Sequence, residues 1–155
     1  MHKVYQTTFG FSDACKPEEK GNCYSACLAS LMDLSLHSVP NFHVVTSQKN
    51  IDWGTAVNAW LAERGLWTTH VLWSKEWLEY WAPQAGGYIL SGKSPRGDHN
   101  HAVVAEGTKI WHDPASREYP FQTGLEASSE EFPWVVEILV PFDYSGHTRL
   151  PRAHG

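Results

Sequence analysis

The sequence has no long apolar run and no cluster of basic residues. No segment is apolar and long enough to span a membrane, and the N-terminal stretch MHKVYQTTFGF lacks the apolar core of a signal peptide. The 12 Lys and Arg residues are scattered among 17 Asp and Glu residues, which gives a net charge of −5. Binding nucleic acid through its backbone requires clustered positive charge. We therefore expect neither a membrane nor a nucleic acid as a partner.

Cysteine is scarce as well, and the glycine motifs that bind nucleotides are missing. An odd number of cysteines, three, in a chain without an export signal argues against disulfides and favours a reducing cytoplasm. Cys15, Cys23 and Cys27 lack the close pair that is usual in structural zinc sites. A metal site that also uses His99 and His101 stays an alternative. We expect no metal and no cofactor.

The apolar residues that are present follow a helical period in the first half and a strand period in the second. This order predicts one α+β domain over residues 1–144, in which an antiparallel β-sheet packs on the N-terminal helix. Residues 145–155 are predicted to form a flexible tail. The predicted elements are helices over 22–34, 52–65 and 75–81, a turn over 35–42, strands over 66–73, 87–92 and 134–142, a hairpin over 101–113, and an irregular connection over 114–133.

Two of the cysteines lie four residues apart in the stretch GNCYSACLASLMDL. If Asn22 caps the helix, Cys23 occupies its first position, where backbone N–H groups and the helix dipole stabilise a thiolate. Cys27 falls one turn later on the core-facing stripe, where a cysteine usually behaves as a small apolar residue. Cys23 is therefore the candidate nucleophile. The alternative is a buried cysteine with a purely structural role.

A nucleophilic cysteine needs a base, and the base needs a group that orients it. The segment DHNHAVVAEGTKIWHDP offers both if its hairpin turns through three residues, 106–108, because His101 then lies opposite Asp113. A two-residue turn would send Asp113 to the other face of the sheet. The alternative is that both side chains are solvated at the end of the hairpin.

Together, GNCYSACLASLMDL followed by VPNF, and NHAVV followed by IWHDP, resemble the small papain-like cysteine peptidases of bacteria and their phages. The resemblance extends over about residues 3–116. It implies a papain-like α+β fold in which the leading helix carries the cysteine. It also implies that Cys23 is the nucleophile, His101 the general base and acid, and Asp113 the orienting group.

The resemblance further implies a side-chain donor to the oxyanion a few residues before the cysteine. Position 17, where such enzymes often have Gln, is Pro17 here. Gln6 is the nearest upstream glutamine and can serve if residues 7–20 loop out and return. Asn22 is a competing donor. The papain string CGSCW is absent, and Tyr24 follows the cysteine.

The eight tryptophans either fill the core with large rings or line a cleft for an extended ligand. The expected function is a cytoplasmic thiol hydrolase that cleaves an amide, peptide or isopeptide bond. Its partner would be a peptide or protein with an extended segment in an aromatic-lined cleft. An acyl or peptidyl transferase with the same site and a catalytically silent peptide-binding module are the alternatives.

Overall fold

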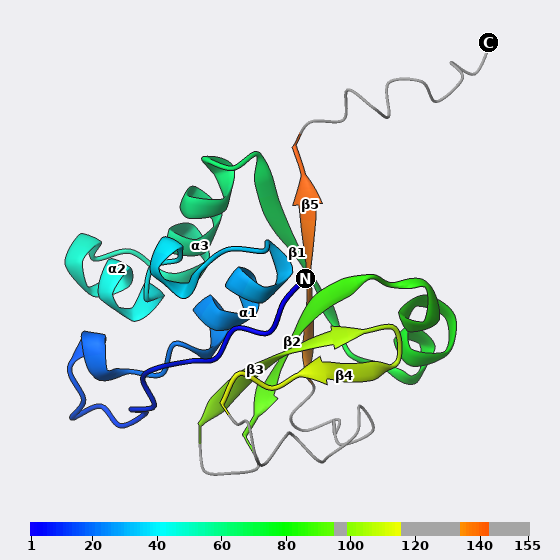
Figure 1. Cartoon of the computed structure of the whole chain (residues 1–155), viewed down its shortest axis with the longest axis horizontal. Coiled ribbons are helices and arrows are strands. Elements are labelled where there is room, and N and C mark those ends of the chain that lie inside the picture. Colours follow the sequence, from blue (N-terminus) through cyan, green and yellow to red (C-terminus); the bar gives the residue numbers. More distant parts are fainter. Residues whose placement is uncertain (95–98, 116–133, 143–155) are drawn as a thin grey trace.

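The computed structural model describes residues 1–94, 99–115 and 134–142 (Figure 1). Their helical elements are η1 (Pro17–Glu19), α1 (Cys23–Leu31), η2 (Leu36–Ser38), α2 (Phe42–Lys49), α3 (Trp53–Ala62), η3 (Trp77–Trp81) and η4 (Ala82–Gln84). The strands are β1 (Leu66–Leu72), β2 (Gly87–Lys93), β3 (Asn100–Glu106), β4 (Lys109–His112) and β5 (Val135–Pro141).

The five strands form one sheet in the order β1-β5-β2-β3-β4, and every neighbouring pair is antiparallel. β5, the last strand along the chain, therefore lies between β1 and β2. Its interior position agrees with its sequence, because every residue of VVEILV except Glu137 is a branched aliphatic residue. The predicted α+β class with an antiparallel sheet is confirmed.

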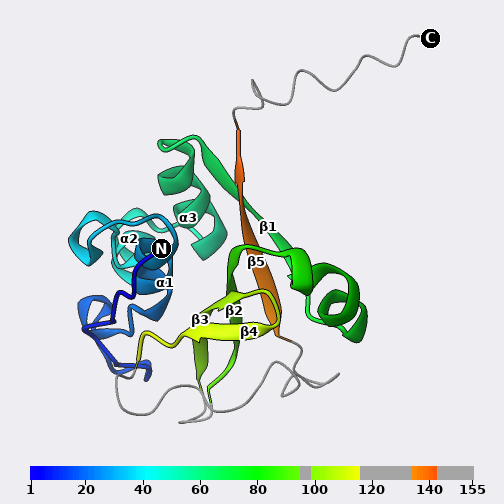
Figure 2. The ribbon, with the colours of Figure 1, turned by 45° about the vertical axis from the view of Figure 1, so that its right-hand side comes forward.

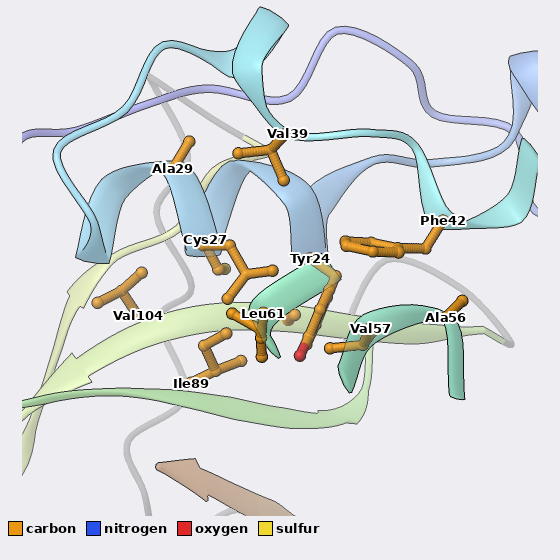
Figure 3. Close-up of a cluster of buried hydrophobic side chains, with 12 residues drawn as sticks. Tyr24, Cys27, Ala29, Val39, Phe42, Ala56, Val57, Leu61, Ile89 and Val104 are labelled. Atoms are coloured by element: carbon orange, nitrogen blue, oxygen red, sulfur yellow. The ribbon is translucent and has the colours of Figure 1, made fainter. Parts of the chain in front are cut away.

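The three α-helices gather on one side of the sheet in both views (Figures 1 and 2). α1 contacts β2 and β3, and α3 contacts β1. The largest core cluster fills this interface, and Cys27 is one of its fully buried members, together with Leu61 from α3 and Ile89 from β2 (Figure 3). The prediction that Cys27 faces the core is confirmed.

A second core cluster covers the opposite face of the sheet. Trp77 of η3 and Trp134 pack there against Tyr88 and Leu90 of β2, whereas the intervening Ile89 belongs to the cluster on the helical side. Side chains alternate between the two faces of a strand, so β2 is apolar on both. This burial on both sides gives the sheet a rigid position under α1.

The helices are shorter than predicted, α1 among them, and α2 was not predicted. α1 ends at Leu31 and not at Leu34, because Asp33 adopts a left-handed backbone with φ 54°. α2 lies just after the predicted turn at 35–42. Its signal was Asn41, whose side chain accepts a hydrogen bond from the His43 N–H at 3.1 Å and caps the helix.

The predicted tail at 145–155 and most of the predicted irregular connection lie outside the described residues. The domain limits therefore stay a prediction. Within the described ranges, no helix is long and apolar enough to cross a membrane.

Candidate active site

The two cysteines of α1 differ in burial, although they lie only one helical turn apart. Cys23 is the first residue of the helix and is partly exposed, whereas Cys27 is fully buried. Burial, and next the neighbouring Cys23, raise the pKa of the Cys27 thiol well above its ordinary value. Only Cys23 therefore combines access to solvent with the N-terminus of a helix, as a reactive thiolate requires.

The β3–β4 hairpin turns differently from the prediction. Glu106 pairs with Lys109, so only Gly107 and Thr108 form the loop, and the predicted three-residue turn is wrong. Gly107 accounts for the tight turn, since its φ of 57° lies in the left-handed region that two-residue hairpin loops use. A regular ladder beyond this turn would place His101 and Asp113 on opposite faces.

A β-bulge corrects this alternation. Ala105 pairs with Ile110, but Val104 pairs with His112, so β4 contains one extra residue, Trp111. The extra residue shifts the alternation of the following side chains by one position. Asp113, directly after β4, therefore turns to the face of His101.

The contact between the base and its orienting group is direct. His101 Nε2 lies 2.7 Å from Asp113 Oδ1, and the side chains are only 4% and 0% exposed. The same oxygen accepts a hydrogen bond from the Ala115 N–H at 2.9 Å, which holds the carboxylate in place. The predicted proximity of His101 and Asp113 is confirmed.

The side chain of Cys23 lies close enough to His101 to affect the pKa of its imidazole. Because Nε2 is engaged with Asp113, Nδ1 is the ring nitrogen that remains for the thiol. Burial by itself lowers the pKa of His101, but hydrogen bonds and charge from Asp113 and Cys23 outweigh it and raise the pKa to about 9. At neutral pH these contacts favour the imidazolium, the natural partner of a thiolate.

Gln6 reaches this site through a loop that leaves and returns. Gly10 and Gly21 close the base of the loop, since the Gly10 N–H donates to Glu19 O at 2.9 Å and the Gly21 N–H donates to Gly10 O at 2.8 Å. The predicted looping of residues 7–20 is therefore present. Gln6 lines the same cleft as Cys23 and His101.

The amide of Gln6 is oriented by its surroundings. Its Nε2 donates to Thr8 O at 2.8 Å, and its backbone N–H donates to Pro114 O at 2.9 Å. The side chain is largely buried, and Oε1 has no hydrogen-bond partner among the described residues. Because the Thr8 carbonyl fixes which end of the amide carries hydrogen, one N–H of Nε2 remains for a ligand.

Asn22 stands at the N-cap position but does not cap α1 through its side chain. Its Oδ1 accepts from the N–H groups of Thr7 at 2.9 Å and Thr8 at 3.1 Å, and its Nδ2 donates to Thr7 Oγ1 at 3.0 Å. The predicted cap is therefore wrong, because the N-terminal segment occupies the amide. Asn22 instead ties the Gln6 segment to the start of the helix. No local sequence signal indicates contacts across 15 residues.

The residues around Cys23 form a cleft of about 700 Å³. Aromatic rings contribute to its lining from two regions: Phe9 and Phe11 from the N-terminal loop, and Tyr24 and Trp53 from the helices. Trp53 is the single tryptophan among the lining residues of the described chain. Most of the other tryptophans pack against the two core clusters. Most of the tryptophans therefore pack in the core, as one prediction had it, and one of them lines the cleft.

Sequence reasoning missed a second polar group in the cleft. Glu137 of β5 lies opposite His70 of β1, and its Oε2 is 3.2 Å from His70 Nε2. The Tyr24 hydroxyl donates to Oε1 of the same carboxylate. These residues are 113 and 67 positions from Glu137 along the chain. The pairing of β1 with β5 brings His70 to Glu137, and the packing of the helices on the sheet brings Tyr24 there.

No protein-family model, no curated protein and no solved structure matches this chain. Over residues 1–94, 99–115 and 134–142, no group of three His, Cys, Asp or Glu side chains is gathered closely enough to hold a metal ion. The side chains that can take part in chemistry at this site are Cys23, His101, Asp113 and Gln6.

Proposed function

We propose that the protein is a papain-like thiol hydrolase that cleaves an amide, peptide or isopeptide bond. The observation that carries the proposal is the buried His101, which contacts Asp113 at 2.7 Å and lines the same cleft as Cys23, whose side chain helps to raise its pKa. A cysteine at the start of a helix, a histidine near the start of a strand and an aspartate after the next strand are arranged as such an enzyme requires.

In the first half of the reaction, the Cys23 thiolate adds to the carbonyl carbon of the substrate. The C–N bond then breaks as His101 gives its proton to the leaving amine, and the acyl group remains on the sulfur as a thioester. In the second half, His101 takes a proton from water, the hydroxide displaces the sulfur, and a carboxylic acid leaves. Asp113 holds the imidazole in one orientation and stabilises its positive charge.

The carbonyl oxygen becomes an anion in both halves of the reaction. The backbone N–H of Cys23 and the remaining N–H of Gln6 Nε2 are the two donors on this side of the cleft. Fixed donors of this kind stabilise the tetrahedral intermediate more than the planar substrate. Gln6 is therefore assigned as the oxyanion donor and Asn22, through Thr7 and Thr8, as the residue that positions its segment.

The test is selective alkylation of Cys23. Near neutral pH, iodoacetamide should modify Cys23 much faster than Cys27, because only Cys23 has an accessible thiol beside an imidazolium. Peptide mapping by mass spectrometry measures the two rates in one sample, and His101→Ala is the variant that should slow Cys23. Preferential labelling of Cys27, or equal labelling of both, would contradict the assignment.

Activity is tested with peptide, isopeptide and ubiquitin-like amide reporters, with Cys23→Ala as the inactive control. Acyl transfer to an added amine, in preference to water, would identify the site as a transferase. A fast-labelling Cys23 with no turnover of any reporter would indicate a peptide-binding module.

A further inference from the structure

Glu137 is a buried carboxylate in the wall of the cleft that the proposed mechanism does not use. Its side chain is 8% exposed, while that of His70 beside it is 54% exposed. Glu137, His70 and Tyr24 all line the cleft that contains Cys23. Tyr24 directly follows Cys23 in α1, and its hydroxyl donates to the carboxylate of Glu137, so the nucleophile and the carboxylate belong to neighbouring parts of one cleft.

Charge is distributed unevenly over the walls of this cleft. Glu137, from the sheet, is the single acidic residue among the described lining residues. Lys20 lies on the helical side of the cleft, near His43. Burial, and after it the charge of the Lys20 ammonium, lowers the pKa of the His43 imidazole. A ligand therefore meets positive charge at the helical wall and negative charge at the sheet wall.

The carboxylate of Glu137 has unused capacity for hydrogen bonds. Its two oxygens can accept about four, and Tyr24 and His70 each supply one. The Tyr24 hydroxyl brings no positive charge to the site, and the effect of His70 on the pKa of Glu137 is smaller than that of burial. Burial raises the pKa of Glu137, which means that its charged form lacks the stabilisation that water would give. A bound cation would restore that stabilisation.

Aromatic rings complete the surroundings of this carboxylate. Tyr24 and Trp53 meet edge to face, with ring centroids 5.6 Å apart, and both line the cleft. Aromatic rings attract organic cations through their negative faces, and guanidinium groups in particular combine such stacking with hydrogen bonds to a carboxylate.

We propose that Glu137, Tyr24 and Trp53 form a subsite for a cationic side chain, so that the enzyme prefers substrates with Arg or Lys beside the bond it cleaves. The subsite rests on the proposed hydrolase function, because it takes Cys23 as the point of cleavage. Glu137 is a specificity-determining residue in this assignment, and His70 and the Tyr24 hydroxyl hold its carboxylate in place.

The experiment uses short peptides that carry a vinyl sulfone in place of the scissile carbonyl. One of the two residues before the vinyl sulfone is Arg, its neutral isostere citrulline, or Leu. The Cys23 sulfur adds to the vinyl carbon, and mass spectrometry gives the rate of modification without any need for turnover. Wild type should react about tenfold faster with the arginine peptide than with the citrulline peptide, as expected for one charge-assisted contact.

Glu137→Gln should reduce this ratio to about one, since it keeps the shape of the side chain and removes its charge. Glu106→Gln removes an exposed carboxylate from the far end of β3 and should leave the ratio unchanged. If the circular dichroism spectrum of Glu137→Gln departs from that of wild type, His70→Lys replaces it, since His70 is the more exposed of the two side chains. An ammonium beside Glu137 competes with the cation of the substrate and should lower the arginine preference about threefold, and an unchanged ratio would overturn the subsite.

The outcomes separate the two proposals. Equal rates for arginine and citrulline, with normal labelling of Cys23 by iodoacetamide, overturn the cationic subsite and leave the hydrolase in place. A ratio that survives in Glu137→Gln also overturns the subsite, and a fastest reaction with the leucine peptide identifies an apolar subsite instead. Slow labelling of Cys23 by iodoacetamide itself overturns the hydrolase.

Discussion

Cys23 and Cys27 lie on the same helix, one turn apart, in opposite environments. Cys23 sits at the N-terminus of α1 beside His101 and borders the cleft, whereas Cys27 is fully enclosed by the core. The same side chain is therefore found in two environments that favour opposite reactivity of its thiol. Burial alone makes a cysteine inert, while partial exposure, a helix N-terminus and a paired imidazole together make it reactive.

The largest expected difference between the two cysteines is in catalytic turnover after each thiol is removed. Cys23→Ala should lower turnover of a cleaved reporter by about 10⁴-fold or more, because no covalent intermediate can form. Cys27→Ala should keep its turnover per folded molecule, because its sulfur lies in the core. Steady-state kinetics on both variants measures the difference. A Cys23→Ala enzyme with more than a few per cent of wild-type turnover would refute the assignment.

A second variant tests Gln6, a polar side chain that lies in the cleft beside Cys23 and not in the core around Cys27. Gln6→Ala should lower kcat by about 10²–10³-fold, with little change in fold, if its Nε2 stabilises the oxyanion. Gln48→Ala, in which an exposed glutamine of α2 is removed, is the matched control. Activity within a factor of two or three of wild type would leave the oxyanion to backbone donors alone.

The pKa of His101 predicts a pH dependence of stability. Because the folded pKa is raised from 6.5 to about 9, the stabilising contribution is complete below pH 6.5 and is lost as the pH rises through 9. The free energy of unfolding should fall by about 2–3 kcal/mol over this window. Asp113→Asn should make the loss smaller, and urea titrations at several pH values compare the two proteins. An equally steep loss in the variant would show that Asp113 does not hold the imidazolium.

Measurements of turnover should rank the variants of Asp113 and His101 by their loss of activity. Asp113→Asn keeps a carbonyl acceptor for the ring and should lose less activity than Asp113→Ala. His101→Ala should lose most, because neither half of the reaction then has a base. An Asp113→Ala enzyme as active as Asp113→Asn would assign the carboxylate a structural role only.

The smallest expected effect concerns the stability of the core cysteine. Cys27→Ser should lower the free energy of unfolding by about 1–3 kcal/mol, because a hydroxyl is buried in an apolar cluster without an assured partner. Cys23→Ser should lower it by less, since this residue is partly exposed and its hydroxyl can be hydrated. Thermal or urea unfolding of the two variants sharpens the comparison, and an equal loss in both would contradict it.

The parts of this site that lie close along the chain could be predicted from the sequence. The spacing of Cys23, Cys27 and Leu31 places the first cysteine at a helix start and the second in the core, and local periodicity is sufficient for that. The strand limits were also recovered, because β-branched and aromatic residues alternate with turn residues in the second half.

The hairpin shows where local reasoning stopped. The sequence predicted the contact of His101 with Asp113 but reached it through a three-residue turn, whereas the structure uses a two-residue turn and a bulge at Trp111. The two routes give the same side-chain alternation. Trp111, the extra residue, packs against the core cluster under α1, and such a long-range contact is not encoded in the turn residues.

The Tyr24, His70 and Glu137 group could not be predicted, because it requires the order of the strands. Nothing in the alternation of β1 or β5 indicates that they are neighbours. Asn22 illustrates the same limit on a smaller scale. Its position predicted a cap, but a segment 15 residues earlier supplied better partners for its amide.

The place of β5 in the sheet bears on the order in which parts of the protein are completed during synthesis. Among the strands of the described residues, β5 leaves the ribosome last, yet it must pair with both β1 and β2. Before it emerges, the helix that carries Cys23 and the hairpin that carries His101 can form, but the cleft lacks the wall that contains Glu137. Pairing across such long sequence distances is slow. A nascent chain would thus hold its thiol ready before it could select a substrate.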